Sequence, residues 1–184
     1  AWRAMAQETI EHNEANPEDP TRWMNNMFGG MPVTMTMDKL EGDWTQKIYD
    51  SFMIGRRPAS FLFITMVGAF LLMLSLGING IVAAAGAIAV AFCSYNLQII
   101  EVGHNTKMQA IAFFPWVLAG VIFTYRTAIG TIRKSKEKPE TKDSAWKSWL
   151  PKTILGAVLF AVALSMQIKA NHLQITYYLA IVIF

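Results

Sequence analysis

Apolar side chains dominate the chain from Pro58 onward and fall into runs of helix length. Residues 58–100 carry no charged side chain, and the run is broken only by Gly77-Ile78-Asn79-Gly80. A helix that crosses a bilayer needs roughly 20 apolar residues, and the runs 60–76 and 81–100 come close to that length. The pattern therefore predicts two membrane-spanning helices joined as a hairpin.

Two more apolar runs, 110–125 and 153–168, are slightly short for a perpendicular crossing but can span if their ends snorkel. A fifth begins near Gln174 and reaches the last residue, Phe184. The chain starts with Ala1 rather than methionine, inside a helical pattern, and no signal-peptide core precedes it. We expect an excerpt from a longer protein, in which the span from about 174 is truncated. The predicted fold class is all-α, with a polytopic transmembrane helical bundle over 59–184.

Residues 1–58 precede the spans and place apolar side chains at helical spacing. One stripe is strong and a second is weaker; they consist of Leu40, Trp44, Ile48 and Phe52, and of Trp2, Met5, Thr9 and Ile10. The weaker helix must end at Asn16-Pro17 and Asp19-Pro20. Between the stripes, Gly29 and Gly30 predict either a turn that approaches a ligand or a tight turn packed on the membrane. We expect a long loop of amphipathic surface helices.

Composition and charge support a membrane protein and orient it. The chain is 53% hydrophobic and 16% charged, which exceeds the apolar content usual for soluble domains. The loop 126–152 has eight basic and three acidic residues, and residues 1–58 have six basic and nine acidic residues. The positive-inside rule then predicts a cytoplasmic loop at 126–152 and an extracytoplasmic segment at 1–58. Topology accounts for the lysines, so we expect no nucleic acid partner.

Cys93 is the only cysteine, which excludes an internal disulfide and a cysteine zinc site. We expect it to pack within a span. His12 lies between Glu11 and Glu14 in an acidic stretch, where we expect a solvated side chain.

Polar residues that carry chemistry cluster at two predicted helix ends. The first cluster follows an uncharged span and runs from Glu101 to Lys107. If the helix continues, Glu101 and His104 share a face and can act as general base and orienter or help to bind a divalent cation. Lys107 adds a donor suited to phosphate. The alternative is an interfacial loop whose polar groups only face water.

The second cluster is Lys169-Ala170-Asn171-His172, followed by Tyr177 and Tyr178, which are typical of an aromatic interface belt. The topology predicts that both clusters and the Gly29-Gly30 turn lie on the same side of the membrane. We therefore expect them to converge on one extracytoplasmic pocket.

Three segments resemble the YfhO-like bacterial membrane proteins, particularly those of Bacteroidetes. They are Trp23 to Pro32, Glu101 to Lys107 and Ala170 to Tyr178, in the same order and with similar separations. Leu173 differs, because many relatives have proline there. The resemblance implies an N-terminal excerpt of a longer polytopic protein in the bacterial cytoplasmic (inner) membrane.

The same resemblance implies a GT-C type glycosyltransferase. Such enzymes move a sugar from a polyprenyl-phosphate donor to an acceptor, here a cell-envelope glycan, on the outer membrane face. Glu101 matches a second acidic motif, whereas the first acid is expected ahead of Ala1, so we expect the excerpt alone to be inactive. The expected catalytic residues are Glu101 and His104. The expected substrate-binding residues are Lys107, Asn105, Asn171, His172, Gly29 and Gly30.

Two alternatives remain open at this point. Polar residues near spans also line the paths of transporters and lipid flippases, although here they lie mostly towards the span ends, which favours an interfacial site. A non-catalytic membrane assembly subunit would use the same motifs as contact surfaces. A divalent cation is a possible cofactor, with no metal ligands assigned.

Overall fold

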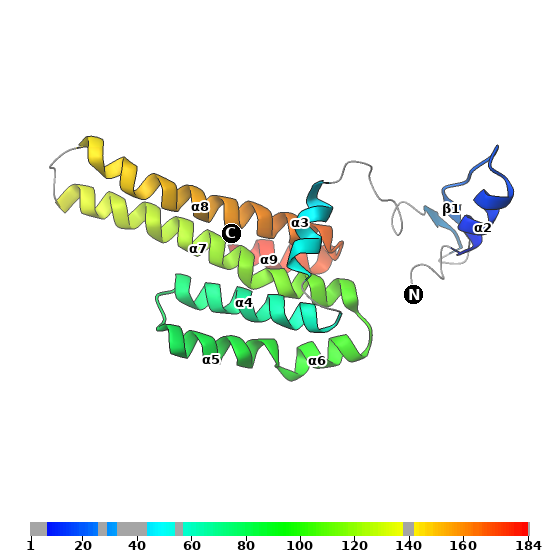
Figure 1. The fold of residues 1–184 in the computed structure, drawn as a ribbon, viewed down its shortest axis with the longest axis horizontal. Coiled ribbons are helices and arrows are strands. Elements are labelled where there is room, and N and C mark those ends of the chain that lie inside the picture. The colour runs from blue at the N-terminus through cyan, green and yellow to red at the C-terminus, as the bar shows by residue number, and fades with distance from the viewer. Residues whose placement is uncertain (1–6, 26–28, 33–43, 54–56, 138–141, 184) are drawn as a thin grey trace. The chain divides into compact units, whose positions relative to one another are not determined.

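The computed structural model describes residues 7–25, 29–32, 44–53, 57–137 and 142–183. They belong to two compact units, 1–44 and 45–184. Helices predominate, as the sequence predicts (Figure 1).

The N-terminal unit contains a short helix and a two-stranded ribbon. Helix α2 (Gln7–Ala15) ends just before Asn16-Pro17, as predicted, because a proline disfavours the helical conformation of the preceding residue. Strands β1 (Trp23–Met24) and β2 (Met31–Pro32) pair antiparallel. The sequence did not predict these strands, since two residues leave no periodicity to detect.

The weaker apolar stripe contributes to this unit through Thr9, which is buried and donates its hydroxyl hydrogen to the carbonyl of Trp23 at 2.9 Å. Trp2 and Met5 lie outside the described residues. The predicted glycine turn is confirmed, with φ of +75° at Gly29 and +121° at Gly30. A Cβ on Gly30 would lie 2.5 Å from the indole nitrogen of Trp23, so the ring would have to move, and the positive φ itself favours glycine there.

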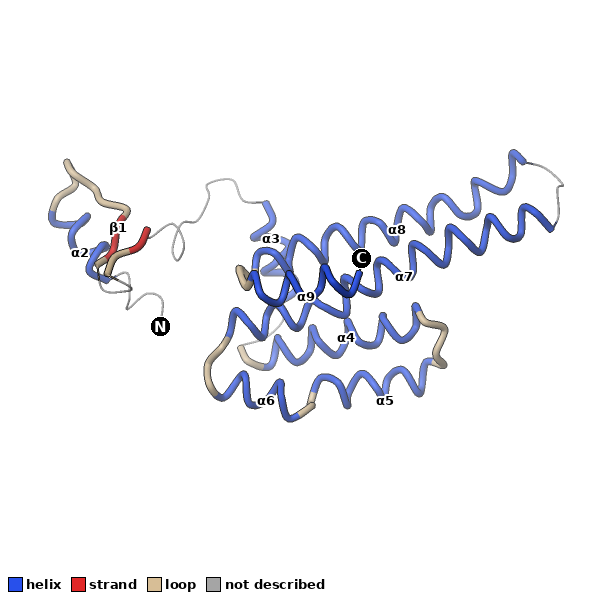
Figure 2. Tube along the Cα trace, turned by 180° about the vertical axis from the view of Figure 1, so that it is seen from behind, coloured by secondary structure: helices blue, strands red, loops and turns tan. Residues whose placement is uncertain are grey.

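The second unit is a helical bundle, seen from two sides in Figures 1 and 2. Its helices are α3 (Trp44–Phe52), α4 (Ala59–Ser75), α5 (Gly80–Ala91), α6 (Ser94–Glu101), α7 (Asn105–Glu137), α8 (Lys142–Lys169) and α9 (Leu173–Ile183). Helix α7 packs against α4, α8 and α9, and α5 packs against α4.

Three segments of the described chain are long and apolar enough to cross a membrane, which indicates a multi-pass membrane protein. They are Gly80–Glu101, Asn105–Ile129 and Leu150–Lys169. Helices α4 and α9 are also apolar but shorter. The expected loop 126–152 is helical on both sides of 138–141, since α7 continues to Glu137 and α8 starts at Lys142.

The predicted span 81–100 is not one continuous helix, because α5 ends at Ala91 and α6 begins at Ser94. The buried Asn96 amide explains the break: it donates to the carbonyls of Val90 and Ala91 at 3.0 and 3.1 Å. Such side chains compete with the helical backbone for hydrogen bonds. Cys93 lies at this break, inside the candidate span Gly80–Glu101, as expected. Its side chain is exposed, so the expectation that it packs against other residues was wrong.

Close packing between α7 and α8 depends on two glycines. A Cβ on Gly120 would lie 2.7 Å from the Cα of Phe160, and a Cβ on Gly156 would meet the hydroxyl of Thr124. Small residues allow helix backbones to approach each other in this way. The facing pairs show that α7 and α8 run antiparallel.

Helix α4 runs parallel to α7, and two side chains of α7 bond to α4 carbonyls. The indole nitrogen of Trp116 donates to the carbonyl of Ile64 at 2.8 Å. Further along, a guanidinium nitrogen of Arg126 donates to the carbonyl of Ser75 at 2.6 Å. The second bond satisfies a carbonyl at the α4 C-terminus, where helices leave such groups without a backbone partner.

Helix α3 packs against the bundle with part of its predicted apolar stripe. Ile48 and Phe52 contact a cluster that includes Ile64 and Phe113. The Phe52 ring meets the rings of Phe113 and Trp116 edge-on, with centroids 5.7 and 5.3 Å apart, a favourable aromatic geometry. Leu40 lies outside the described residues.

Candidate functional site

One end of the helical unit collects most of the polar residues that the sequence singled out. Helices α6 and α8 end there and α4, α7 and α9 begin there (Figure 2). Phe61 near the start of α4 packs with Met108 near the start of α7. We call the turns 101–107 and 169–172, with the adjoining helix ends, the polar end.

The helix does not continue from Glu101 to Asn105, although a shared face for Glu101 and His104 required that it continue. The backbone N–H of His104 donates to the carbonyl of Ile99 at 3.1 Å, and that of Gly103 donates to Ile100 at 3.0 Å. With φ of +80° at Gly103, this is a Schellman motif, which ends a helix. Glu101, His104 and Asn105 are all exposed, but Glu101 and His104 do not lie one helical turn apart on a common face.

Lys107 lies in the first turn of α7 and is half-buried. Its ammonium nitrogen lies 5.4 Å from the ring centroid of Tyr95 on α6. A cation–π contact of this kind holds the charge near the ring face. The contact fixes the cation at the polar end and connects α6 to α7.

The α8–α9 turn contains the second predicted cluster. Asn171 has φ of +52°, a conformation that asparagine tolerates better than most residues, and its N–H donates to the carbonyl of Ile168 at 2.9 Å. Asn171 therefore has a backbone role in ending α8. Its side chain is exposed.

Next to it, His172 is half-buried, and its Nδ1 atom has no hydrogen-bond partner among the described residues. The hydroxyl of Thr176 donates to the Oε1 atom of Gln167 at 2.9 Å and also contacts the carbonyl of His172 at 3.3 Å. Gln167 is fully buried and its amide nitrogen is likewise unpartnered within the described chain. Buried polar atoms without partners are uncommon, and in the described chain one occurs in this turn and another in the last turn of α8 before it.

Sequence reasoning missed a polar network that connects α3, α7 and the residue before α4. The Tyr49 hydroxyl donates to the Oε1 atom of Gln109 at 3.0 Å and accepts a hydrogen bond from an Arg57 guanidinium nitrogen at 2.9 Å. Burial raises the pKa of Tyr49 above its usual value of 10.0, and the Arg57 charge opposes this rise. The only sequence signal was a charge directly before an uncharged run.

A second contact holds α3 at the polar end, where the Lys169 ammonium lies 3.1 Å from the hydroxyl oxygen of Thr45. Thr45 and Tyr49 are four residues apart in α3 and so lie on one face. Basic side chains from the α8 terminus and from residue 57 therefore contact the same face of α3.

In the described parts of the chain, no group of three or more His, Cys, Asp or Glu side chains could hold a metal ion. Glu101 and His104 offer a single carboxylate and a single imidazole on an exposed turn. Divalent cations in proteins usually need more oxygen or nitrogen ligands. The described residues therefore do not by themselves form a complete ligand set for a metal.

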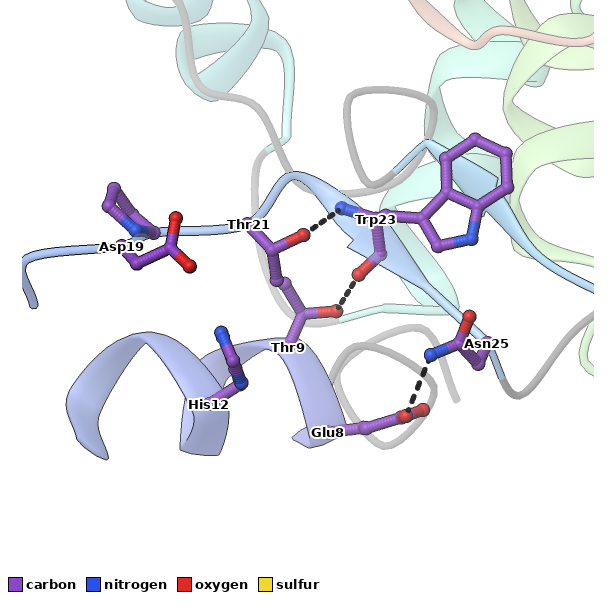
Figure 3. Close-up of a pocket in the computed structure, with 8 residues that line it drawn as sticks. Glu8, Thr9, His12, Asp19, Thr21, Trp23 and Asn25 are labelled. Carbon is purple, nitrogen blue, oxygen red and sulfur yellow. Dashed lines mark hydrogen bonds between the residues drawn. The ribbon is translucent and has the colours of Figure 1, made fainter. Parts of the chain in front are cut away.

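Gly29 and Gly30 belong to the N-terminal unit, which also has a polar cleft of about 380 Å³ (Figure 3). The cleft is lined by Glu8, Thr9, His12, Asp19, Pro20, Thr21, Trp23 and Asn25. His12 is exposed, as predicted. The Glu8 carboxylate accepts from the Asn25 amide at 3.4 Å.

Comparison with protein-family models, curated proteins and solved structures finds no match to this chain.

Proposed function

We propose that this chain is the N-terminal part of a GT-C type glycosyltransferase. The enzyme would transfer a sugar from a polyprenyl-phosphate donor to a cell-envelope glycan acceptor at the outer face of the bacterial inner membrane. The observation that carries the proposal is the polar end itself. Two motifs that resemble the YfhO-like proteins, 101–107 and 170–178, are distant in sequence and lie at one end of an otherwise apolar bundle.

The orientation follows from charge. The basic segment 126–152 includes the end of α7 and the start of α8, which lie away from the polar end. The positive-inside rule assigns that side to the cytoplasm. The polar end then faces outward. The sugar and phosphate of the donor would bind at the polar end, and the polyprenyl tail would lie beside the apolar helices.

In the proposed step, the oxygen of an acceptor hydroxyl attacks the anomeric carbon of the sugar. The bond from that carbon to the phosphate oxygen breaks, and the leaving polyprenyl phosphate keeps the electron pair. The Glu101 carboxylate takes the hydroxyl proton as general base. Lys107, His104 and His172 stabilise the charge on the leaving phosphate.

Glu101 is exposed at a helix end rather than paired on a helix face with His104. An exposed carboxylate at the end of α6 can be reached by an acceptor hydroxyl at the membrane surface. His104 and His172 then act on the phosphate side rather than as orienters of the acid. Asn105 and Asn171 border the two turns and offer amide groups to sugar hydroxyls.

The test uses the chain with the flanking sequence of its natural protein, reconstituted in proteoliposomes. A radiolabelled polyprenyl-phosphate sugar is supplied with a membrane extract as acceptor. We expect transfer of label to the acceptor and its loss in Glu101→Gln. Asp50→Asn is the matched control, because Asp50 is an exposed carboxylate on α3 that pairs with Gln46, and we expect it to keep activity.

Full activity in Glu101→Gln rules out the acid role of this residue. Movement of labelled lipid between leaflets without transfer favours a flippase instead. If neither transfer nor movement occurs with several donor sugars, the assembly-subunit alternative replaces the enzyme.

A further inference from the structure

Arg57 directly precedes Pro58 and α4, which begins at the polar end, and two contacts hold its side chain. One guanidinium nitrogen donates to the Tyr49 hydroxyl at 2.9 Å, and the Cζ atom lies 5.5 Å from the ring centroid of Phe61. The side chain is nevertheless exposed. Tyr49 and Phe61 therefore hold the guanidinium in place, and the rest of the Arg57 side chain is accessible to a ligand.

The support beneath Arg57 is buried. Tyr49 is 6% exposed and Gln109 is 8% exposed, and the Tyr49 hydroxyl is bonded to both Gln109 and Arg57. A polar network in an apolar cluster costs desolvation energy unless its members are satisfied. This network fixes the Arg57 guanidinium relative to the start of α7, where Gln109 and Lys107 lie.

Among the described residues, most of the hydrogen-bonding capacity of Arg57 is unused. A guanidinium has several N–H donors in a rigid fork, and Tyr49 accepts from only one of its nitrogens. In the parts of the chain that the structure describes, Arg57 forms no ion pair with a carboxylate. A positioned cation that is exposed and lacks a counter-ion is suited to an anionic ligand.

The position along the chain identifies the anion. Arg57 directly precedes Pro58 and the apolar helix α4, so it lies where an apolar helix meets the lipid head groups. Phosphate is the anion at that level of a membrane, and the guanidinium fork matches phosphate oxygens in a bidentate manner.

We propose that Arg57 binds the phosphate group of a membrane lipid and that Tyr49 positions Arg57 for this contact. Naming polyprenyl phosphate as that lipid rests on the transferase proposed above. Phosphate binding itself does not, because an ordinary phospholipid carries the same group.

The experiment measures lipid binding to the full chain in detergent by native mass spectrometry. The probes are polyprenyl phosphate, the matching polyprenol without phosphate, phosphatidylglycerol and inorganic phosphate. We expect Arg57→Gln to weaken polyprenyl phosphate binding about tenfold, as loss of a charge-assisted hydrogen bond does, and to leave polyprenol unchanged. Lys152→Gln is the matched control, since Lys152 is an exposed cation in α8 far from the polar end, and we expect no change.

Tyr49→Phe separates positioning from general stability. It keeps the ring and removes the hydroxyl, and we expect binding about threefold weaker than in the unchanged chain. In the Arg57→Gln background the same change should add nothing, because coupled residues are non-additive. Independent losses from the two changes would overturn the positioning role, and unchanged binding in Arg57→Gln would overturn the site.

The lipid probes distinguish the source of the phosphate. Dependence on Arg57 for polyprenyl phosphate but not for phosphatidylglycerol supports a donor site. Equal dependence supports the phosphate site but assigns it to bulk phospholipid, which removes its link to transfer. Because no probe carries a sugar, failure of the transferase proposal leaves this result standing.

Discussion

Replacing Gly120 with alanine tests whether close contact between α7 and α8 sets the packing of the bundle. An added Cβ would lie 2.7 Å from both the backbone N and the Cα of Phe160. These are backbone atoms of α8, which cannot rotate away as a side chain does. The helices must therefore separate or shift along each other.

The expected magnitude follows from two opposing terms. Alanine favours a helix over glycine by about 1 kcal/mol, whereas overpacking a well-packed interface costs about 1–3 kcal/mol. Contact with backbone atoms places Gly120→Ala in the upper part of that range. We expect a net loss of about 1–2 kcal/mol in the free energy of unfolding.

Gly80→Ala is the matched control. Gly80 begins α5, and a Cβ there would meet nothing within 4 Å. The same chemical change should therefore stabilise the chain slightly, by at most about 1 kcal/mol. The two substitutions should have opposite signs.

The assay is unfolding by SDS titration in mixed micelles, followed by helical circular dichroism. If Gly120→Ala is as stable as the unchanged chain, or if both substitutions shift stability in the same direction, the close packing of α7 and α8 is refuted.

Three further predictions use the same unfolding assay. Gly103→Ala should lower the free energy of unfolding by about 1 kcal/mol, because φ of +80° disfavours a Cβ although the surrounding space is open. Gly103→Asn should lower it less, since asparagine tolerates this conformation better. Equal losses would contradict a backbone origin of the effect. Trp116→Phe should lose about 1 kcal/mol with the indole bond to Ile64, and an unchanged stability would show that this bond contributes nothing. Because the pKa of Tyr49 is raised in the folded state, the stabilising effect of this residue is complete below pH 10.0 and is lost as pH rises through the folded-state pKa. In that range the free energy of unfolding of the unchanged chain should fall more steeply with pH than that of Tyr49→Phe, by up to about 1.4 kcal/mol per pH unit. Parallel curves for the two proteins would contradict this.

Much of the fold was determined locally and was therefore visible in the sequence. The apolar runs predicted helices because burial or membrane insertion requires apolar side chains along their whole length. Asn16-Pro17 ended α2, and the Gly29-Gly30 turn took positive φ, because both depend on the conformational limits of single residues.

A local feature of the chain separates Glu101 from His104. Gly103 directly follows an apolar helix, which is a signal for a C-terminal cap, yet the shared face assumed that the helix continues. Its φ of +80° and two backbone hydrogen bonds end α6 instead. The polar residues were found, but their mutual geometry was not.

Only the tertiary structure decided which distant residues meet. Asn96 breaks a predicted span because its amide reaches two carbonyls of α5, and Tyr49 contacts Gln109 and Arg57 because α3 packs on α7. Contacts of this kind depend on the angle and distance between helices, which arise from packing over the whole bundle. The sequence by itself determined most of the helices and the Gly29-Gly30 turn. Packing decided where the predicted span 81–100 breaks and which polar groups share the polar end.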